Sequence, residues 1–133
     1  MKPRDHPEVA PWLALAQADM HIAAVALDQP GSLPEVYGLV CFHGQQAAEK
    51  GLKGLLSALD VPAPRSHDLM RLAEQLPSDC SPPSPILASL AAIADFGVGP
   101  RYPMPGRHTS RDQAVEALEA ASEVFAWVLQ VLG

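Results

Sequence analysis

A proline-rich segment in the C-terminal half of the chain carries the densest group of side chains suited to phosphate chemistry. Residues 100–109 read Pro-Arg-Tyr-Pro-Met-Pro-Gly-Arg-His-Thr, which cannot form regular helix. Histidine accepts or donates a proton near neutral pH, and arginine holds a phosphate through paired donors and stabilises charge that develops on phosphorus. In RNA the neighbouring 2′-hydroxyl can be the nucleophile, so this chemistry needs no metal. Arg101 and His108 are therefore candidate catalytic residues, and Tyr102 and Arg107 are candidate phosphate-binding residues.

The same segment has a structural interpretation. The Arg101 guanidinium could cap a helix C-terminus or pair with Glu49 or Asp19, while the Tyr102 ring covers the core. On that interpretation the arginine and the tyrosine anchor a loop and perform no chemistry.

The stretch from Phe42 to Lys53 combines a helical pattern with polar residues that core packing does not require. His43 and Lys50 are seven residues apart, so they share a helix face and could both point at a phosphate, or that face could simply be solvated. Gln45 falls in the middle of the apolar face, with Glu49 one turn later at its edge. We expect at least one of these two to be buried and hydrogen-bonded.

His67 is a further candidate for phosphate binding. Followed by Asp68, it could be a base with its orienting carboxylate, or a local hydrogen-bond partner just after the helix N-cap Ser66.

The elements that must position these residues are helices, since long windows of the chain lack proline. The windows are 12–29, 35–61, 65–76, 86–99 and 106–133. Capping boxes predict helix starts at Ser32 and Ser110, and Ser84 followed by Pro85 predicts a third. The first helix has a core face and a second apolar patch at Leu15, Ile22, Val25 and Ala26, which could meet another helix or another subunit.

Length and composition predict one all-α domain that spans residues 1–133. The chain has 14.1 kDa, 48% hydrophobic residues and only 5% aromatics, so its core must be built mainly from Ala, Leu and Val, as in closely packed helices. We expect an up-and-down bundle of about five helices with helices 33–60 and 110–132 as its spine, the last being the most enclosed. A stripe of small residues on the central helix, Gly44, Ala47, Gly51, Gly54 and Ala58, would admit another helix closely.

The net charge of −6 argues against a uniformly basic surface that coats nucleic acid. Any phosphate binding must come from a local patch, and seven of the nine Lys and Arg residues lie within 50–53, 65–71 and 101–111. Two cysteines without zinc-ligand spacing predict neither a disulfide framework nor a structural metal, and we expect no cofactor. The N-terminus lacks the apolar region of a signal peptide, and no apolar run reaches the ~18 residues of a membrane span, so we expect a cytoplasmic protein.

Three motifs in this order resemble the HEPN family of small prokaryotic all-helical domains. They are F-H-G-Q-Q-A-A-E-K-G-L-K at 42–53, S-H-D-L at 66–69 and R-Y-P at 101–103, and the A-D-M at 18–20 is similar to the family's first-helix A-D-L. The resemblance implies a dimeric helical bundle, frequently paired with a separate minimal nucleotidyltransferase. In some members it implies a toxin that cuts RNA without metal, and Arg101 with His108 meets the loose form of the family's ribonuclease pattern.

Two functional hypotheses follow. The first is a HEPN-type protein that binds RNA or nucleotide phosphate through Arg101, Arg107, His108, Lys50 and His67, acts with a nucleotidyltransferase partner in a toxin–antitoxin-like module, and cleaves RNA if the loop is catalytic. The second is a non-catalytic module whose apolar patches serve dimerisation and partner binding.

Overall fold

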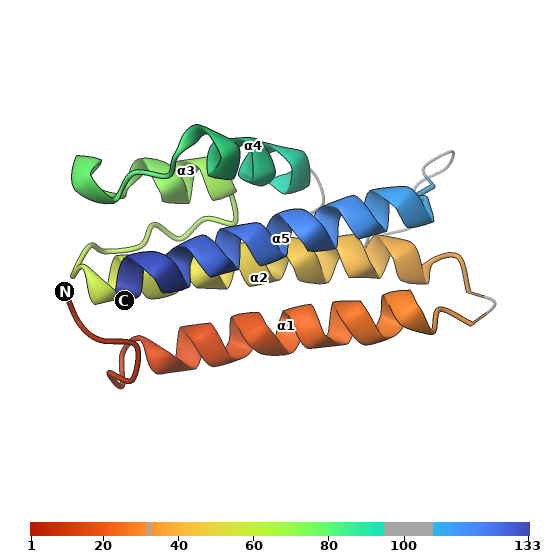
Figure 1. The fold of residues 1–133 in the computed structure, drawn as a ribbon, viewed down its shortest axis with the longest axis horizontal. Helices are drawn as coiled ribbons and strands as arrows, with labels where there is room; N and C mark the ends of the chain where they lie inside the picture. Colours follow the sequence, from red (N-terminus) through yellow and green to blue (C-terminus); the bar gives the residue numbers. More distant parts are fainter. Residues whose placement is uncertain (32, 95–107) are drawn as a thin grey trace.

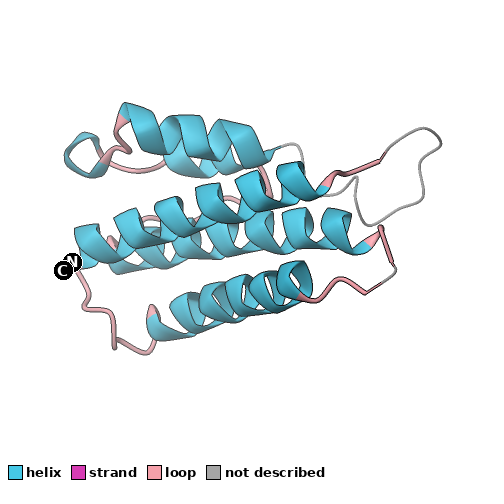
Figure 2. Ribbon diagram, turned by 45° about the vertical axis from the view of Figure 1, so that its right-hand side comes forward, coloured by secondary structure: helices cyan, strands magenta, loops and turns pink. Residues whose placement is uncertain are grey.

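The computed structural model describes residues 1–31, 33–94 and 108–133, and its described part is helical, without strands (Figures 1 and 2). The prediction of an all-α bundle is confirmed. The elements are α1 (Ala10–Asp28), α2 (Val36–Ala58), α3 (Leu69–Glu74), the 3₁₀ helix η1 (Ser78–Cys80), α4 (Ser84–Ile93) and α5 (Arg111–Leu132).

Helix α2 lies at the centre of the bundle, between α1 on one side and α5 on the other, and α4 packs on α5 (Figure 1). Helices α2 and α5 run in the same direction, because Gly44 of α2 lies against Ala117 while Gly51, further along, lies against Phe125. The pairing of α2 with α5 closes the core between them.

The predicted stripe of small residues brings α2 close to two different helices. A Cβ atom at Gly44 would lie 3.3 Å from the backbone oxygen of Ala117 on α5, and one at Gly54 would lie 3.1 Å from the Cβ of Trp12 on α1. Contacts this short leave little room for a methyl group. The absence of a side chain at Gly44 and Gly54 therefore sets how near α5 and α1 can come to α2.

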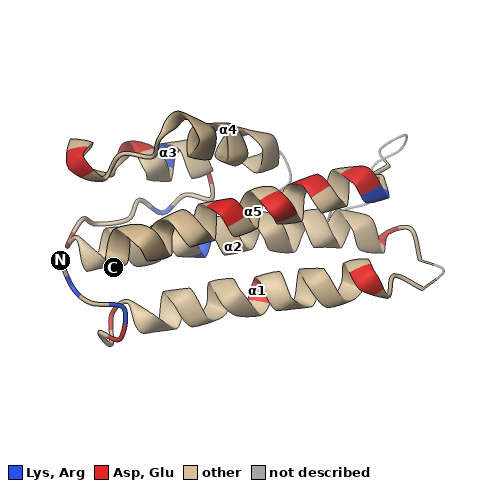
Figure 3. Ribbon diagram, in the orientation of Figure 1, with Lys and Arg blue, Asp and Glu red and all other residues tan. Residues whose placement is uncertain are grey.

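The expectation that the last helix is the most enclosed is wrong. Fourteen of the 23 residues of α2 are buried, against eight of the 22 residues of α5. Packing on both sides of α2 buries most of its circumference, whereas the N-terminal half of α5 keeps an exposed acidic edge (Figure 3). The acidic side chains on this edge are Asp112, Glu116, Glu119 and Glu123.

Two helix starts differ from the predicted ones. The N-cap of α3 is Asp68, whose carboxylate accepts from the amides of Met70 and Arg71, while the Ser66 hydroxyl accepts from the amide of Asp68. The carboxylate is the better cap because it satisfies two of the free amides at the start of the helix. Helix α4 begins at Ser84 itself with Pro83 as N-cap, one residue earlier than predicted.

The other predicted helix ends are the starts of α2 and α5 and the end of the fourth helix. The capping box of Ser110 and Gln113 is present at the start of α5, as predicted. Helix α2 begins at Val36 with no side-chain cap from Glu35, and Ser32 lies outside the described residues. The predicted end of the fourth helix near residue 97 also lies outside them.

The N-terminal arm ties the ends of two helices together. The amide of Lys2 donates to the carbonyl of Ala58 at the end of α2 (2.8 Å), and the Arg4 guanidinium donates to the carbonyl of Leu129 near the end of α5 (2.6 Å). A cationic side chain that donates to a helix C-terminal carbonyl also opposes the negative end of the helix dipole.

Helix α1 has an exposed apolar face. Leu15, Ile22 and Val25 are 51%, 49% and 52% exposed, which agrees with their predicted place outside the core. By length and composition this helix could also cross a membrane, contrary to the expectation from apolar run lengths. That is weak evidence, because core helices of soluble proteins and signal sequences pass the same test. In the bundle, α1 contacts α2 along its length and carries the buried Asp19.

Candidate functional site

A buried aspartate joins α1 to the polar face of α2. One carboxylate oxygen of Asp19 lies 2.9 Å from Nδ1 of His43, and the other accepts from Nζ of Lys50 at 2.6 Å. The Asp19 side chain is only 10% exposed, whereas the histidine and the lysine reach the surface. A histidine and a lysine seven residues apart on α2 therefore meet at one carboxylate, as their shared helix face predicts.

A second buried carboxylate repeats this arrangement. Glu49 is 5% exposed at its side chain, and its two oxygens lie 2.8 Å from Nδ1 of His67 and 3.1 Å from Nζ of Lys53. Here the lysine comes from α2 and the histidine from the link between α2 and α3. Each carboxylate thus holds one lysine and one histidine, and in both units Nδ1 is the ring atom that is engaged.

Gln45 completes the attachment of the link to α2. It is fully buried, its Nε2 donates to the backbone oxygen of His67 at 2.9 Å, and its Oε1 accepts from Nε2 of Gln46 at 3.0 Å. The prediction that Gln45 or Glu49 is buried and hydrogen-bonded is confirmed for both residues.

His67 does not pair with its sequence neighbour. The carboxylate of Asp68 caps α3, and the imidazole turns to Glu49 instead. The pairing of a histidine with an orienting carboxylate is thus present, but the carboxylate comes from a residue 18 positions earlier. Asp68 accepts instead from two backbone amides at the start of α3, through Oδ1.

The polar face of α2 is a half-covered stripe, because α1 and the link shield its two sides. Its members are neither buried nor fully exposed: His43, Gln46, Lys50, Lys53 and Ser57. We call these five residues the α2 stripe. The two lysine charges are balanced by the two buried carboxylates, so an excess of positive charge on this surface depends on protonation of the imidazoles.

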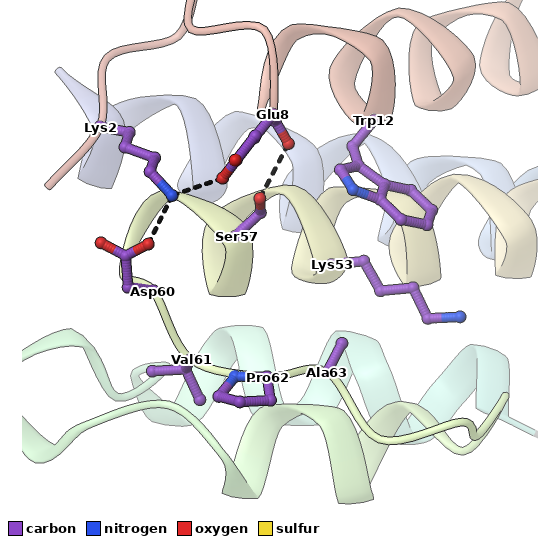
Figure 4. A pocket seen from close by; sticks show the side chains of 9 residues that line it. All are labelled: Lys2, Glu8, Trp12, Lys53, Ser57, Asp60, Val61, Pro62 and Ala63. Atoms are coloured by element: carbon purple, nitrogen blue, oxygen red, sulfur yellow. Dashed lines mark hydrogen bonds and ion pairs between the residues drawn. The ribbon is translucent and has the colours of Figure 1, made fainter.

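A pocket of about 300 Å³ opens at the end of the α2 stripe (Figure 4). Trp12 of α1, Lys53 and Ser57 of α2, and residues 61–63 form its walls. The Lys53 ammonium lies 5.8 Å from the centroid of the indole ring, within reach of a cation–π interaction.

Lys2 closes the far side of this pocket by pairing with two carboxylates, Glu8 and Asp60. These hydrogen bonds raise the pKa of the Lys2 ammonium and lower the pKa of both carboxyl groups. The N-terminal ammonium also lowers the pKa of the Asp60 carboxyl, so the two acids at this side face two cationic groups.

The predicted catalytic loop lies mostly outside the described residues. Arg101, Tyr102 and Arg107 belong to the segment 95–107, which lies outside the described residues. The structure therefore tests neither their catalytic role nor the alternative role of Arg101 and Tyr102 as a loop anchor. His108 is exposed just before the start of α5. Among the described residues, the partners of Asp19 and Glu49 come from α2 and the link.

The sequence analysis did not predict the pocket, nor that Trp12 and Lys53 line it. Trp12 lies on α1 and is partly exposed, and Lys53 pairs with Glu49 one turn earlier on α2. Lys53 and Ser57 share a face of α2 at i, i+4, which by itself does not predict a pocket. The approach of residues 61–63 and of Lys2 is a tertiary contact for which the sequence holds no local pattern.

Comparison with known proteins agrees with this architecture. The HEPN domain family model matches residues 9–131. A crystal structure of TT1696 from Thermus thermophilus superimposes with a TM-score of 0.82 and 29% identity, covering 92% of this chain and 97% of that one. ST0689, described as an archaeal HEPN homologue, superimposes with a TM-score of 0.75 and 25% identity over 100% of both chains. No curated protein matches the sequence significantly. The motifs, the helical bundle and the family match agree, and the chain belongs to the HEPN domain family.

Proposed function

We propose that this protein binds the phosphates of RNA or of a nucleotide on the α2 stripe, with His67 beside it. The observation that carries the proposal is the pair of matched units in which a buried carboxylate holds a lysine and a histidine at a half-covered surface. Buried anchors fix the side chains before a ligand arrives, so little conformational entropy is lost on binding.

The chemistry of these side chains suits an anion. Lys50 and Lys53 each offer N–H donors beyond the one that their carboxylate accepts, and Nε2 of each imidazole is the ring atom left after Nδ1 is engaged. A protonated imidazole would add a donor and a charge at the same place. We infer that Arg101 and Arg107 extend this surface and that His108, with Arg101, supplies the metal-independent cleavage of RNA which the family pattern implies.

The test is retention of single-stranded RNA at low salt by the wild-type protein and by Lys50→Ala and His67→Ala. Both variants should weaken binding, and the salt dependence of Lys50→Ala should be shallower, because one fewer phosphate contact releases fewer counterions. Asp112→Ala, an exposed change on α5, is the control and should leave binding unchanged or slightly stronger. Unaltered retention in both variants would contradict the proposal.

A second candidate function rests on the apolar face of α1. We propose that Leu15, Ile22 and Val25 form a homodimer contact, or hold a minimal nucleotidyltransferase partner, in a cytoplasmic toxin–antitoxin-like module. Three large apolar side chains, each about half exposed on one helix, are more than a solvated surface requires. The oligomeric state in solution tests the first version, and co-purification with a co-expressed minimal nucleotidyltransferase tests the second.

A further inference from the structure

Helix α2 ends in a backbone conformation that ordinarily selects glycine. The amide of Val61 donates to the carbonyl of Leu56, and the amide of Asp60 donates to the carbonyl of Ser57. Together these two bonds form a Schellman motif, in which Asp60 takes the left-handed position with a φ of 57°. Glycine is the usual residue at that position because a Cβ atom is disfavoured at positive φ. An aspartate there points to a role for its side chain.

The Asp60 side chain holds the N-terminal arm. Its carboxylate accepts from Nζ of Lys2, and the amide of Lys2 donates to the carbonyl of Ala58 at 2.8 Å. Nζ of Lys2 also pairs with Glu8, whose backbone carbonyl accepts from the hydroxyl of Ser57 at 2.8 Å. Both ends of the segment 2–8, which we call the strap, are thus attached to the last turn of α2.

The strap brings positive charge to two helix ends that lack it. Helices α2 and α5 run in the same direction and end at the same end of the bundle (Figure 1), so the negative ends of their dipoles lie near each other. Neither helix has a basic residue in its last turn. Lys2 lies at the end of α2, and the guanidinium of Arg4 donates to the carbonyl of Leu129 on α5 at 2.6 Å. The strap therefore bridges the two helix ends with opposite charge.

Polar contacts hold the strap in place. Residues 1–8 bury no apolar side chain, and the first buried apolar residue is Val9. The side chains of Glu8 and Asp60 are 64% and 75% exposed, so salt screens their ion pairs with Lys2. These contacts can break while the core from Val9 onward stays packed.

We propose that the strap is a salt-sensitive conformational device that opens without unfolding of the bundle and controls how firmly the ends of α2 and α5 are joined. When it is closed, Lys2 and Arg4 oppose the two helix dipoles. When it is open, both helix ends lose these cations and the last turn of α5 frays. Lys2 and Glu8 also form one wall of the pocket beside Trp12 (Figure 4), so an open strap uncovers this side of the pocket.

Amide hydrogen exchange, followed by NMR, tests the strap. In Arg4→Gln the amides in the last turn of α5 should be about threefold less protected than in wild type at low salt. The difference should vanish as NaCl rises from about 0.01 to 1 M, because the Debye length falls from about 30 to about 3 Å. Arg71→Gln, which removes an equally exposed arginine on α3, is the matched control and should match wild type throughout.

The core amide of Leu52 distinguishes opening of the strap from loosening of the whole bundle. Its protection should be the same in Arg4→Gln and in wild type, since Leu52 is fully buried in the middle of α2. An equal loss of protection at Leu52 and at the end of α5 would overturn the proposal. So would an α5 end that is as well protected in Arg4→Gln as in Arg71→Gln.

Asp60→Gly separates the strap from the helix cap. Glycine suits the φ of 57° and keeps the end of α2, so the amide of Val61 should stay protected. The substitution removes the partner of Lys2, so the last turn of α5 should lose protection as in Arg4→Gln. In a Trp127→Phe background, which leaves Trp12 as the reporter, acrylamide should quench Trp12 more strongly after Asp60→Gly. Wild-type protection of α5 with unchanged quenching would show that Asp60 serves only the end of α2.

Discussion

Nδ1 of His67 lies 2.8 Å from Oε1 of Glu49, and this contact attaches the link between α2 and α3 to the central helix. The backbone oxygen of the same histidine accepts from Gln45, so one residue of the link is held through both its side chain and its main chain. The carboxylate is 5% exposed and the imidazole 74% exposed. The fold thus presents a histidine to solvent while its orientation is fixed from the interior.

The buried amide of Gln45 should contribute to stability in spite of its polarity. Gln45→Leu removes the donor to His67 and the acceptor of Gln46, and we expect a loss of about 1 to 3 kcal/mol in the free energy of unfolding. Gln130→Leu, at an exposed glutamine on α5, is the control and should leave the free energy of unfolding nearly unchanged. Urea unfolding measures both, and a Gln45→Leu protein at least as stable as wild type would show that its hydrogen bonds contribute nothing.

Removing Lys50 should lower the free energy of unfolding more than removing the charge of Asp19. In Lys50→Met the carboxylate stays buried with only His43 beside it, and we expect a loss of about 3 kcal/mol. In Asp19→Asn the lysine can turn its ammonium to water, and we expect a loss of about 1 kcal/mol. Thermal and urea unfolding of the two variants would contradict this account if Asp19→Asn proved the more damaging.

Cys41 should make stability fall at alkaline pH. Burial raises the pKa of its thiol from 9.0 to about 11. The unfolded chain therefore releases this proton at lower pH than the folded protein does. The contribution of this thiol to the free energy of unfolding is fully present below pH 9 and is lost as the pH rises toward 11. Urea unfolding between about pH 8 and 11 should show wild type losing stability relative to Cys41→Ala, and parallel profiles would show that the folded thiol ionises normally.

The exposed face of α1 provides a test of self-association. Ile22→Glu places a charge in the middle of this face, where the side chain is 49% exposed, so it should convert a dimer to a monomer of 14.1 kDa with little change in melting temperature. Ala92→Glu, an exposed alanine on α4, is the control and should leave the mass unchanged. Light scattering that gives a monomer for wild type at micromolar concentration would defeat the homodimer proposal.

Local patterns predicted the fold and part of the site, because helical periodicity and capping are properties of neighbouring residues. The face shared by His43 and Lys50, the burial of Gln45 and the capping box at Ser110 all follow from spacing alone. The partner of His67 could not be predicted in this way. The carboxylate that pairs with His67 belongs to Glu49 on α2. The adjacent Asp68 is the partner that the sequence suggests, but it caps α3.

The enclosure of α2 was missed for a related reason. A helical wheel shows which residues are apolar, and by that measure α5 has the narrower polar stripe. Burial depends on how many neighbours surround a helix. Helix α2 has α1 on one side and α5 on the other, and its small residues let both approach closely. The number of neighbours is a property of the topology.

The activity of the proline-rich segment separates the two functional classes. If it is a ribonuclease site, His108→Ala should abolish cleavage of single-stranded RNA while binding stays largely intact, because the imidazole moves protons and contributes little to ground-state affinity. Arg101→Ala should lose both cleavage and binding. Cleavage should persist in EDTA and should be weak on DNA, which lacks the 2′-hydroxyl.

If the segment only binds, Arg101 or Arg107 substitutions should weaken association in a salt-dependent way, and His108→Ala should change little near neutral pH. Wild-type protein that neither cuts nor retains RNA at low salt would contradict both the ribonuclease and the RNA-binding hypotheses. The non-catalytic module for dimerisation and partner binding would then be the remaining hypothesis.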